Sequence, residues 1–460
     1  MEEIKNIVQL LIKEKSWQEL KRELLHLEPF HIAELISVID RREQIIIFRL
    51  LGHKQAKNVF KYLGIKEQED IINSLADNVK LLTSLLNDLD PDDRTALFEE
   101  LPGEVSQKLI QLLSNKERNI ANQLLGYPKD SVGRLMTTDF VAVKPNFTVE
   151  EALQHIRKFG QDSETLDVIY IVDDNWKLVS DLRIKELLLA NPDIPMHSLA
   201  KHHAISLSVF DDQEHAAQSF AKYGRTALPV TDSAGILLGI ITVDDVFDVQ
   251  ERENTEDFQK FGGIEGLDLS YKKTSLLKLV KKRAGWLVIL FFSEMLTASA
   301  MGYYDNEISK AVVLALFVPL IISSGGNSGS QAASLIIRSL ALGDLKLKSW
   351  WYVMRKEILS GLMLGAILGA IGFIRILVWQ FTGFYDYGPY WVWVGISVAF
   401  SLVFIVLWGT LSGSMIPFVL KRIGLDPATA SAPFVATLVD VTGLVIYFSV
   451  AAVFLTGKLL

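Results

Sequence analysis

The chain has 460 residues, a formal net charge of −8 and 50% hydrophobic residues, and it contains no cysteine. Such a length predicts several domains, the lack of cysteine excludes disulfides and thiolate metal sites, and the acidic balance argues against nucleic acid as a partner. Residues 1–283 carry 36 Lys+Arg and 46 Asp+Glu, whereas residues 284–460 carry 10 and 8. We therefore expect an acidic soluble part followed by a membrane part.

Residues 1–130 are predicted to be helical throughout. Apolar residues recur at spacings of three and four, as at Ile32, Leu35, Ile36 and Ile39, which is typical of amphipathic helices. Because turn-forming residues interrupt this pattern repeatedly, we expect a stack of short helices like a solenoid. The interruptions are at Gly52, Gly64, Asp77-Asn78 and Pro102-Gly103.

One stretch of this segment, LDPDDRTALFEELP, places Asp90, Asp92 and Asp93 close together. Asp90 followed by Pro91 is a strong helix start, and the next carboxylates would face the positive end of the helix dipole. Helix capping is therefore sufficient to explain the three aspartates. A metal site formed by them is the second interpretation.

Residues 131–250 contain an internal repeat. Residues 140–188 and 204–249 each show the order strand, helix, two strands, helix. The duplicated unit resembles a pair of CBS domains, and the second copy carries the signature G-x-x-T-x-x-D as Gly239, Thr242 and Asp245. The first copy departs from this signature, because Ser180-Asp181 stands where the glycine is expected.

The CBS resemblance implies a site for an adenine nucleotide. In CBS domains the hydroxyl and the carboxylate of the signature commonly hold the ribose and phosphates. This implies ATP as a ligand of Asp181, Gly239, Thr242 and Asp245. A purely structural regulatory pair without nucleotide stays open as the alternative, because the first copy departs from the signature.

Residues 246–282 are predicted to form an acidic connecting helix and a linker. Glu253, Glu256 and Asp257 recur at spacings that place them on one helical face, where like charges are destabilising unless a cation lies between them. A solvated connector helix is the alternative. Gly262-Gly263 is expected to end the helix.

Five apolar segments follow, and each has about the 20 residues that a membrane-spanning helix needs. Basic residues precede the first segment and separate the second from the third and the fourth from the fifth. By the positive-inside rule, we expect a multi-pass protein of the plasma membrane with cytoplasmic N-terminal domains and the C-terminus outside. An odd number of spans with a large cytoplasmic part is consistent with symmetric assembly. The segments are about 284–303, 308–341, 357–382, 391–420 and 428–455.

The second apolar segment contains the run GGNSGSQ, with Gly325, Gly326, Asn327 and Gln331. We expect this polar run to break the helix, because broken membrane helices use freed backbone groups to line ion or substrate sites. Close helix packing through small residues is the alternative. The two amides favour a pore-lining role, since packing alone does not require them.

Asp440 is the one ionisable residue between Ala428 and Leu455. A charge at the centre of a membrane helix costs about 2.5–3.5 kcal/mol and is usually directed at a partner, a water-filled cavity or an ion path. A structural aspartate paired with Ser, Thr or Lys of a neighbouring helix is the alternative.

The two membrane motifs, FVPLIISSGGNSGSQAASLIIRSLALGD and DPATASAPFVATLVDVTG, resemble the MgtE family of magnesium channels or transporters, and the order of segments matches that family from end to end. The resemblance implies a homodimer whose copies line one central pore. Asp440 matches the pore carboxylate, Ala436 lies one turn before it, and Asp426 matches an acidic residue at the cytoplasmic mouth. Ala432 stands where some members have asparagine. Positions implied to bind regulatory magnesium are Asp245, Asp248, Glu253, Glu256 and Asp257.

The chemistry of Mg²⁺ agrees with this assignment. Mg²⁺ prefers octahedral oxygen ligands, keeps several waters and is held by one or two carboxylates. Two Asp440 side chains facing one axis would supply these ligands, while Asn327, Thr437 or backbone carbonyls would bond to the water shell. Zn²⁺ and Cu²⁺ favour imidazole or thiolate, and no histidine follows His215.

We therefore predict an all-α N-terminal domain (1–130), an α/β tandem CBS pair (131–250), a connecting helix and linker (246–282) and a five-helix transmembrane pore domain (283–460). The predicted function is Mg²⁺-selective uptake that closes when cytosolic Mg²⁺ binds the acidic sites. The alternatives are transport of further divalent cations such as Co²⁺ and Mn²⁺, and a membrane-tethered sensor of Mg²⁺ or adenylate without conduction. An anion path would want positive or dipolar donors. We expect no enzymatic activity, because the sequence has no nucleophile–base set and no P-loop.

Overall fold

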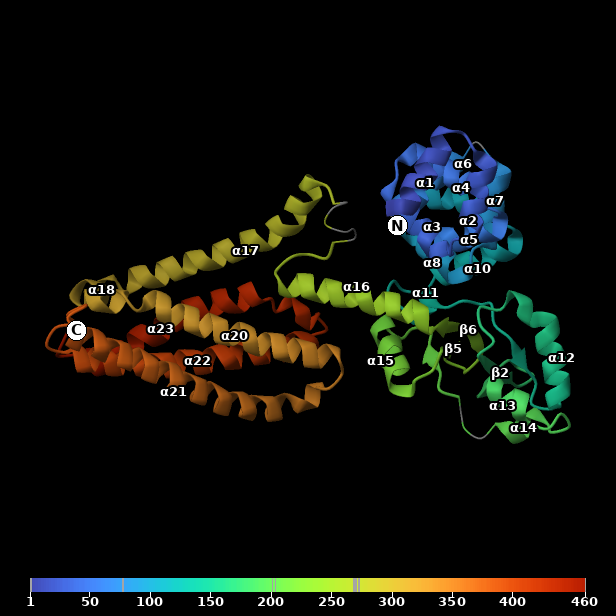
Figure 1. The fold of residues 1–460 in the computed structure, drawn as a ribbon. Helices are drawn as coiled ribbons and strands as arrows, with labels where there is room; N and C mark the ends of the chain where they lie inside the picture. Colours follow the sequence, from blue (N-terminus) through green and yellow to red (C-terminus); the bar gives the residue numbers. More distant parts are fainter. Residues whose placement is uncertain are drawn as a thin grey trace. The chain divides into compact units, whose positions relative to one another are not determined.

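The computed structural model describes residues 2–76, 78–200, 202, 204–267, 271 and 274–459. Asp77 of the predicted helix interruptions, and positions 268–270, 272 and 273 of the predicted linker, lie outside these residues. The chain divides into two compact units, Met1–Gln250 and Glu251–Leu460 (Figure 1). The domain boundaries given above stay a prediction.

The first part of unit 1 is a stack of short helices, as the sequence predicts. Helices two apart in the order pack on one another, such as α3 on α5 and α5 on α7, and leucine, isoleucine and phenylalanine side chains between them form one core. The helices are α1 (Glu2–Lys13), α2 (Trp17–Leu25), α3 (Pro29–Val38), α4 (Arg41–Leu50), α5 (His53–Lys61), α6 (Ile65–Leu75), α7 (Val79–Asp88), α8 (Pro91–Glu100), α9 (Gly103–Leu112), α10 (Asn115–Leu125) and α11 (Val132–Leu135).

These helices follow a repeat that the sequence reading did not find. From α3 to α10, the residue before each helix recurs every 12 residues, with one step of 14 between Gly64 and Asn78. A polar side chain four residues after that position donates to backbone carbonyls at the end of the preceding helix, as Gln44 Nε2 does to Ile36 O at 2.8 Å. The residues that do this are Gln44, Gln68, Arg94, Ser106 and Arg118.

This back-bonding explains how such short helices persist. Helices below about 12–15 residues are marginal in isolation, and the last four carbonyls of each lack a partner within the helix. Here the next helix supplies those partners, so each helix is stabilised by its neighbour in the chain as well as by burial.

The rest of unit 1 consists of two copies of one topology. Each copy has a three-stranded sheet in which the first two strands are parallel and the last two antiparallel. The register shifts at equivalent places, Ile171/Val172 and Val230/Thr231. This confirms the predicted pair of α/β repeats. The elements are β1 (Ala142–Val143), α12 (Val149–Phe159), β2 (Val168–Val172), β3 (Leu178–Arg183), α13 (Ile184–Leu189) and α14 (Met196–Leu199), then β4 (Leu207–Ser208), α15 (Gln213–Tyr223), β5 (Ala227–Thr231), β6 (Leu237–Thr242) and α16 (Val243–Phe261).

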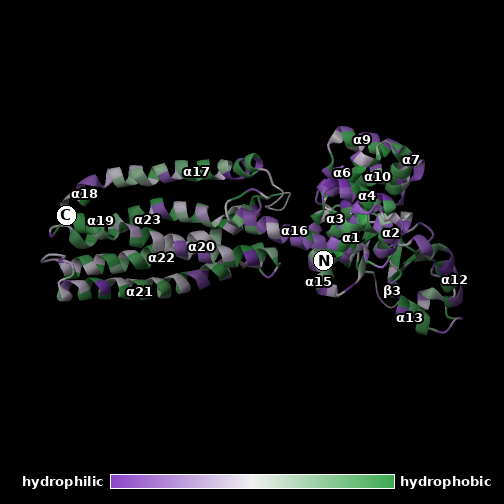
Figure 2. Cartoon of the chain, turned by 45° about the horizontal axis from the view of Figure 1, so that its top comes forward, coloured by the Kyte–Doolittle hydropathy of each residue, from purple (hydrophilic) through white to green (hydrophobic). Residues whose placement is uncertain are grey.

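Unit 2 is built from long apolar helices. Five helical spans of the described residues are long and apolar enough to cross a membrane, and hydrophobic residues dominate α17, α21, α22 and α23 in Figure 2. Helix α22 lies at the centre, packed on α20, α21 and α23. The helices are α17 (Leu276–Tyr303), α18 (Asp305–Lys310), α19 (Val312–Ala315), α20 (Val318–Ala341), α21 (Trp350–Thr382), α22 (Trp391–Arg422) and α23 (Ala432–Leu455).

The predicted break at GGNSGSQ is wrong, because α20 is continuous from Val318 to Ala341. The interruption of this spanning segment lies earlier, between α19 and α20. Pro319 follows it as the second residue of α20. The glycines serve close packing instead. A Cβ at Gly329 would lie 2.9 Å from the carbonyl oxygen of Gly409, and a Cβ at Gly409 would collide with the carbonyl of Gly325. Small residues on both helices therefore allow their backbones to touch.

Candidate ion-binding sites

Asp440 lies half-buried on α23, on the edge that faces α20. Helix α23 begins after Ser431, whose hydroxyl accepts a hydrogen bond from the Phe434 N–H. A Cβ built at Gly326 would lie 3.4 Å from the Cβ of Ala436 and 3.7 Å from Oδ1 of Asp440. The missing side chain at Gly326 thus leaves the Asp440 carboxylate beside the backbone of α20.

Helix α20 carries a polar stripe, which we define as Ser323, Asn327, Gln331, Ser334 and Arg338. All five side chains are exposed on the single chain, and their spacings of four, four, three and four place them on one face of the helix. Asn327 Nδ2 donates to Ser323 Oγ at 3.3 Å. Polar groups of a spanning helix are tolerated only where protein or water covers them. This face of α20 is therefore unsuited to contact with lipid.

The structure separates the predicted pore residues into two groups. Asn327 and Gln331 belong to the exposed polar stripe, and Gly326 and Ala436 lie beside Asp440. Gly325 is instead buried against Ile405 and Val439, which is a packing position. Thr437 is half-buried, and its hydroxyl donates to the backbone carbonyl of Pro433 at 2.9 Å. Ser334 and Arg338 were not among the predicted pore residues. Their spacings of three and seven from Gln331 place them on the same helix face and would have indicated them.

A second set of charged residues lies where α16 ends. Lys260 Nζ lies 2.8 Å from Glu256 Oε1 and 2.7 Å from Asp426 Oδ2. Burial alone would lower the pKa of Lys260, but hydrogen bonds to Asp426 and Glu256 outweigh it and raise the pKa. Burial, followed by the charge of Asp426, raises the pKa of Asp257.

The other predicted residues of α16 precede this set on the helix. Arg338 Nη1 of the polar stripe donates to Asn254 Oδ1 at 3.2 Å. Glu253 is half-buried, and Asp248, one of the predicted regulatory positions, is exposed on the same helix. Within the part of unit 2 described here, Glu256, Asp257 and Asp426 are therefore brought together around a lysine ammonium.

A third set of charges lies in unit 1, around Lys61 of α5. Lys61 Nζ lies 3.7 Å from Asp93 Oδ2 and 4.0 Å from Asp244 Oδ2. Asp92 is only 6% exposed, and burial, together with the charges of Asp245 and Asp93, raises its pKa. Burial raises the pKa of Asp93 to about 6.

The same cluster includes residues from both CBS copies. Burial raises the pKa of Glu164 to about 7, with Asp90 as the next cause. Asp245 accepts a hydrogen bond from Thr242 Oγ1 at 2.7 Å, and burial raises the pKa of Asp245 although that hydrogen bond opposes it. The carboxylates of Asp92, Asp93, Asp244, Asp245 and Glu164 thus lie around Lys61.

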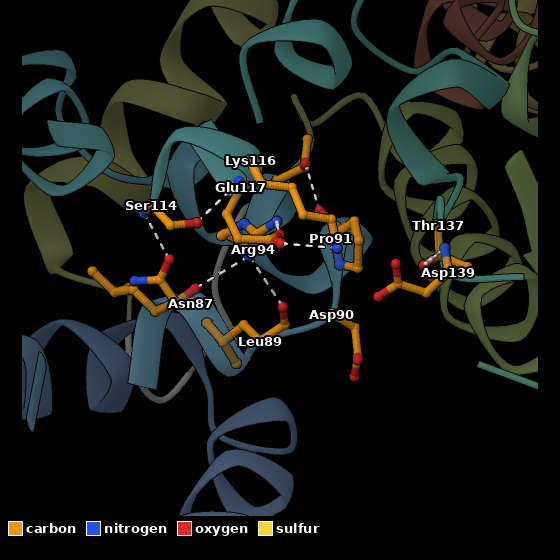
Figure 3. Close-up of polar contacts among 12 residues, drawn as sticks. Asn87, Leu89, Asp90, Pro91, Arg94, Ser114, Lys116, Glu117, Thr137 and Asp139 are labelled. Carbon is orange, nitrogen blue, oxygen red and sulfur yellow. Dashed lines mark hydrogen bonds and ion pairs between the residues drawn. The ribbon is translucent and has the colours of Figure 1, made fainter. Parts of the chain in front are cut away.

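Asp90 does occupy the predicted position before α8, but the capping role is wrong. Within the described residues its carboxylate makes no capping hydrogen bond; it pairs with Lys57 Nζ at 2.6 Å. Arg94 of α8 is fully buried, and its guanidinium donates to Glu117 Oε2 at 2.6 Å (Figure 3). This contact ties α8 to α10.

The predicted nucleotide residues form two contact sets. Asp181, 3% exposed, pairs with Arg225 Nη2 at 3.0 Å and lies 3.7 Å from His202 Nε2. Thr242 and Asp245 are joined by the hydrogen bond described above. Gly239 allows a close approach of chain segments, since a Cβ there would lie 2.6 Å from the carbonyl oxygen of Thr137.

Across the described residues, no three His, Asp or Glu side chains are arranged to hold a metal ion. The clusters that contain Asp93 and Asp426 each include a lysine instead, Lys61 in one and Lys260 in the other. Binding of a divalent cation in either cluster therefore requires that the lysine or the carboxylates move.

Comparison with known proteins decides the family. Family models match residues 318–450 as "Divalent cation transporter", residues 27–130 as the MgtE intracellular N domain, and residues 132–193 and 196–252 as CBS domains. The chain is 35% identical to the magnesium transporter MgtE of Thermus thermophilus over 97% of this chain and 98% of that protein. This chain belongs to the MgtE family. It is also 29% identical to MgtE of Bacillus subtilis over 97% of this chain and 99% of that protein.

Solved structures extend the MgtE likeness to unit 1. The cytosolic domain of the Mg²⁺ channel MgtE in complex with ATP aligns with a TM-score of 0.50 and 30% identity, covering 53% of this chain and 98% of that one. The soluble part of a magnesium transporter aligns with a TM-score of 0.51 and 28% identity, over 55% and 99%. Membership of the MgtE family, together with the five apolar helices, makes this a multi-pass membrane protein of a transporter family.

Proposed function

We propose that this protein mediates magnesium uptake across the plasma membrane as a homodimer, and that cytosolic Mg²⁺ closes its pathway. The observation that carries the proposal is the polar stripe of α20, exposed beside Asp440 of α23. Five polar side chains and a carboxylate along one side of two spanning helices are incompatible with hydrocarbon. A second copy and a water-filled path between the copies would cover them.

The ligands suit a hydrated Mg²⁺. This ion dehydrates reluctantly and is usually held by one or two carboxylates and its own waters. Asp440 from each of two copies supplies the carboxylates, and the amides of Asn327 and Gln331 offer hydrogen bonds to the water shell. The names of the two bacterial relatives, both magnesium transporters, support the choice of Mg²⁺.

We assign the closing of the pathway to the two acidic clusters, around Lys61 and around Lys260. At low cytosolic Mg²⁺, carboxylates of the N-terminal, CBS and connecting-helix regions repel one another and move apart. At high Mg²⁺ the ions bridge them, and the closed state gains population because it binds Mg²⁺ more tightly. The raised pKa values of Asp92, Asp93 and Asp257 support this role, since burial there leaves negative charge poorly solvated.

An adenine nucleotide is proposed as a ligand of the CBS pair. The solved relative with bound ATP supports it, as does the T-x-x-D signature, whose Thr242 and Asp245 lie within hydrogen-bond distance. The basic residues between the spans support cytoplasmic N-terminal domains and an external C-terminus.

The decisive experiment is divalent uptake into liposomes that contain the purified protein. We expect Mg²⁺ influx that falls as internal Mg²⁺ is raised. Asp440→Asn should abolish influx while gel filtration and helical content stay as in the wild type. Asp344→Asn, in the exposed loop after α20, is the matched control and should leave influx unchanged. Normal influx through Asp440→Asn would contradict the pore assignment, and a wild-type protein without influx would favour the non-conducting sensor.

Broader divalent transport is the second candidate, favoured by the description of the matching family model as a divalent cation transporter. Competition by Co²⁺ or Mn²⁺ in the same liposomes separates it from Mg²⁺ selectivity.

A further inference from the structure

Glu294 is a second carboxylate inside the membrane-spanning part, and neither membrane motif contains it. It lies on α17 between apolar residues, in the run ILFFSEMLT, and its side chain is exposed on the single chain. In the described part of unit 2, no hydrogen bond or ion pair holds this carboxylate. An intramembrane carboxylate costs about 2.5–3.5 kcal/mol unless it faces a partner or a water-filled path, so Glu294 requires an explanation.

Two contacts between α17 and α23 place Glu294 at the depth of Asp440. Toward the start of both helices, Trp286 Nε1 donates to Ser431 Oγ at 2.9 Å, and its ring lies 6.1 Å from that of Phe434. Toward their ends, the rings of Tyr304 and Phe448 stack at 4.7 Å. The two helices therefore run side by side in the same direction.

The depth follows from counting residues between these contacts. Glu294 is eight residues after Trp286, and Asp440 is six residues after Phe434. Glu294 is ten residues before Tyr304, and Asp440 is eight before Phe448. At a rise of about 1.5 Å per residue, the two carboxylates differ in depth by only about 3 Å.

Glu294 lies at the edge of the face by which α17 packs on the bundle. The half-buried or buried residues of α17 in this region are Leu290, Ser293 and Thr297. Glu294 is four residues after Leu290 and three before Thr297, so it borders this packed face.

Thr297 adds an independent observation at the same place. It is only 7% exposed, and in this structure its hydroxyl has no hydrogen-bond partner. A buried hydroxyl without a partner costs free energy unless an ion or its water shell satisfies it. Thr297 lies one helical turn beyond Glu294, on the packed side of α17.

We propose that Glu294 is a specificity-determining residue of the ion pathway, which with Asp440 favours divalent over monovalent cations. This inference rests on the proposed function of cation transport. The interaction of a fixed charge with an ion scales with the charge of that ion, so an added carboxylate at the depth of Asp440 stabilises a divalent cation twice as much as Na⁺ or K⁺. Because Mg²⁺ keeps its waters, Glu294 acts through the field and the water shell without direct ligation.

The test compares Glu294→Gln with the wild type in liposomes containing the full chain. We expect the external Mg²⁺ concentration for half-maximal uptake to rise about threefold to tenfold, the effect of one lost charge in a partly solvated site. The maximal rate should be kept because Asp440 remains, and Na⁺ should compete more strongly. Glu294→Asp keeps the charge and should restore values close to those of the wild type. Glu357→Gln, a half-buried carboxylate on α21, is the matched control and should change neither quantity.

A second measurement needs no transport. Mg²⁺ that binds the folded protein raises its melting temperature, so the Mg²⁺ concentration required for protection in detergent should rise for Glu294→Gln and not for Glu357→Gln. The inference would be overturned by a folded Glu294→Gln protein that behaves as the wild type in all three measurements. These are the Mg²⁺ concentration for half-maximal uptake, the competition by Na⁺ and the protection against melting by Mg²⁺. A wild-type protein that takes up no Mg²⁺ at all would instead remove the proposed function on which the inference depends.

Discussion

Lys260 Nζ lies 2.7 Å from Asp426 Oδ2 and thereby joins the end of α16 to the segment that leads into α23. The same ammonium lies 2.8 Å from Glu256 Oε1. Glu256, a predicted regulatory Mg²⁺ position, and Asp426, the predicted acidic residue at the cytoplasmic mouth, thus share a cation of the chain itself. A divalent ion between Glu256 and Asp426 would compete with Lys260 for the same oxygens.

Removing this lysine should make closure depend more on Mg²⁺. In Lys260→Gln the two carboxylates repel one another when no divalent ion is present, so flux at low internal Mg²⁺ should rise, and its inhibition by internal Mg²⁺ should become steeper. Liposome uptake at several internal Mg²⁺ concentrations measures both. Lys281→Gln changes an exposed lysine before the first span and should behave as the wild type. Equal flux at low Mg²⁺ for both variants would contradict the competition.

Neutralising the acidic face of α16 should weaken the gate. In the triple variant Glu253→Gln, Glu256→Gln and Asp257→Asn, the charges that Mg²⁺ would bridge are gone, and we expect flux that is less inhibited by internal Mg²⁺. The same uptake assay measures this, and the maximal flux should be retained because Asp440 is unchanged. Inhibition identical to that of the wild type would remove this helix from the gate.

The acidic cluster around Lys61 should make the stability of unit 1 depend on pH. Burial raises the pKa of Asp93 to about 6 and that of Glu164 to about 7, above their ordinary values. The folded state therefore binds more protons than the unfolded state between about pH 4 and 7, and its stability falls as pH rises through this window. We expect the melting temperature of a fragment of residues 1–262 to fall by about 5 °C between pH 5 and 8.

Two additions test the cause of this pH dependence. Asp93→Asn removes one of the groups that must lose its proton, so the slope of melting temperature against pH should become smaller. Added Mg²⁺ should raise the melting temperature at pH 8 more than at pH 5, since the ionised carboxylates bind it. A slope unaffected by Asp93→Asn would point to titration elsewhere.

The packing of α20 on α22 should not tolerate a side chain at Gly409. A methyl group there collides with the backbone carbonyl of Gly325, so the helices must separate next to the Asp440 level. We expect Gly409→Ala to lower the melting temperature in detergent and to reduce Mg²⁺ uptake. Gly302→Ala, where a Cβ meets nothing within 4 Å, is the control. Full uptake in Gly409→Ala would show that the contact is dispensable.

The periodic features of the fold were predictable from the chain alone. The alternation of strand, helix, two strands and helix in residues 131–250 is found in both copies, and the five apolar segments correspond to the five spanning helices. Side-chain spacing follows from the covalent geometry of helix and strand, so it is visible without tertiary structure. Helices α17 and α21 begin earlier than predicted, at Leu276 and Trp350, because a helix continues through polar residues beyond the apolar layer.

The run GGNSGSQ shows where local reasoning failed. Glycine costs a helix about 1 kcal/mol in water, which predicted a break. In a spanning segment, however, each backbone group must find a partner, and contact with the glycines of α22 compensates for the missing side chains. Asn327 and Gln331 are exposed on the polar stripe, and their pore-lining role stays a prediction. Gly325 could be distinguished from Gly326 only by its packing against α22 and α23.

Sequence motifs alone identified the family resemblance, the intramembrane Asp440 and the acidic character of the clusters around Lys61 and Lys260, because these depend on residue type and local spacing. Tertiary structure alone placed Lys61 and Lys260 among those carboxylates and Glu294 at the depth of Asp440. Lys61 is 183 positions from Asp244, Lys260 is 166 positions from Asp426, and Glu294 is 146 positions from Asp440. The packing of the helices decides which of these distant charges lie close together, and local sequence patterns do not predict it.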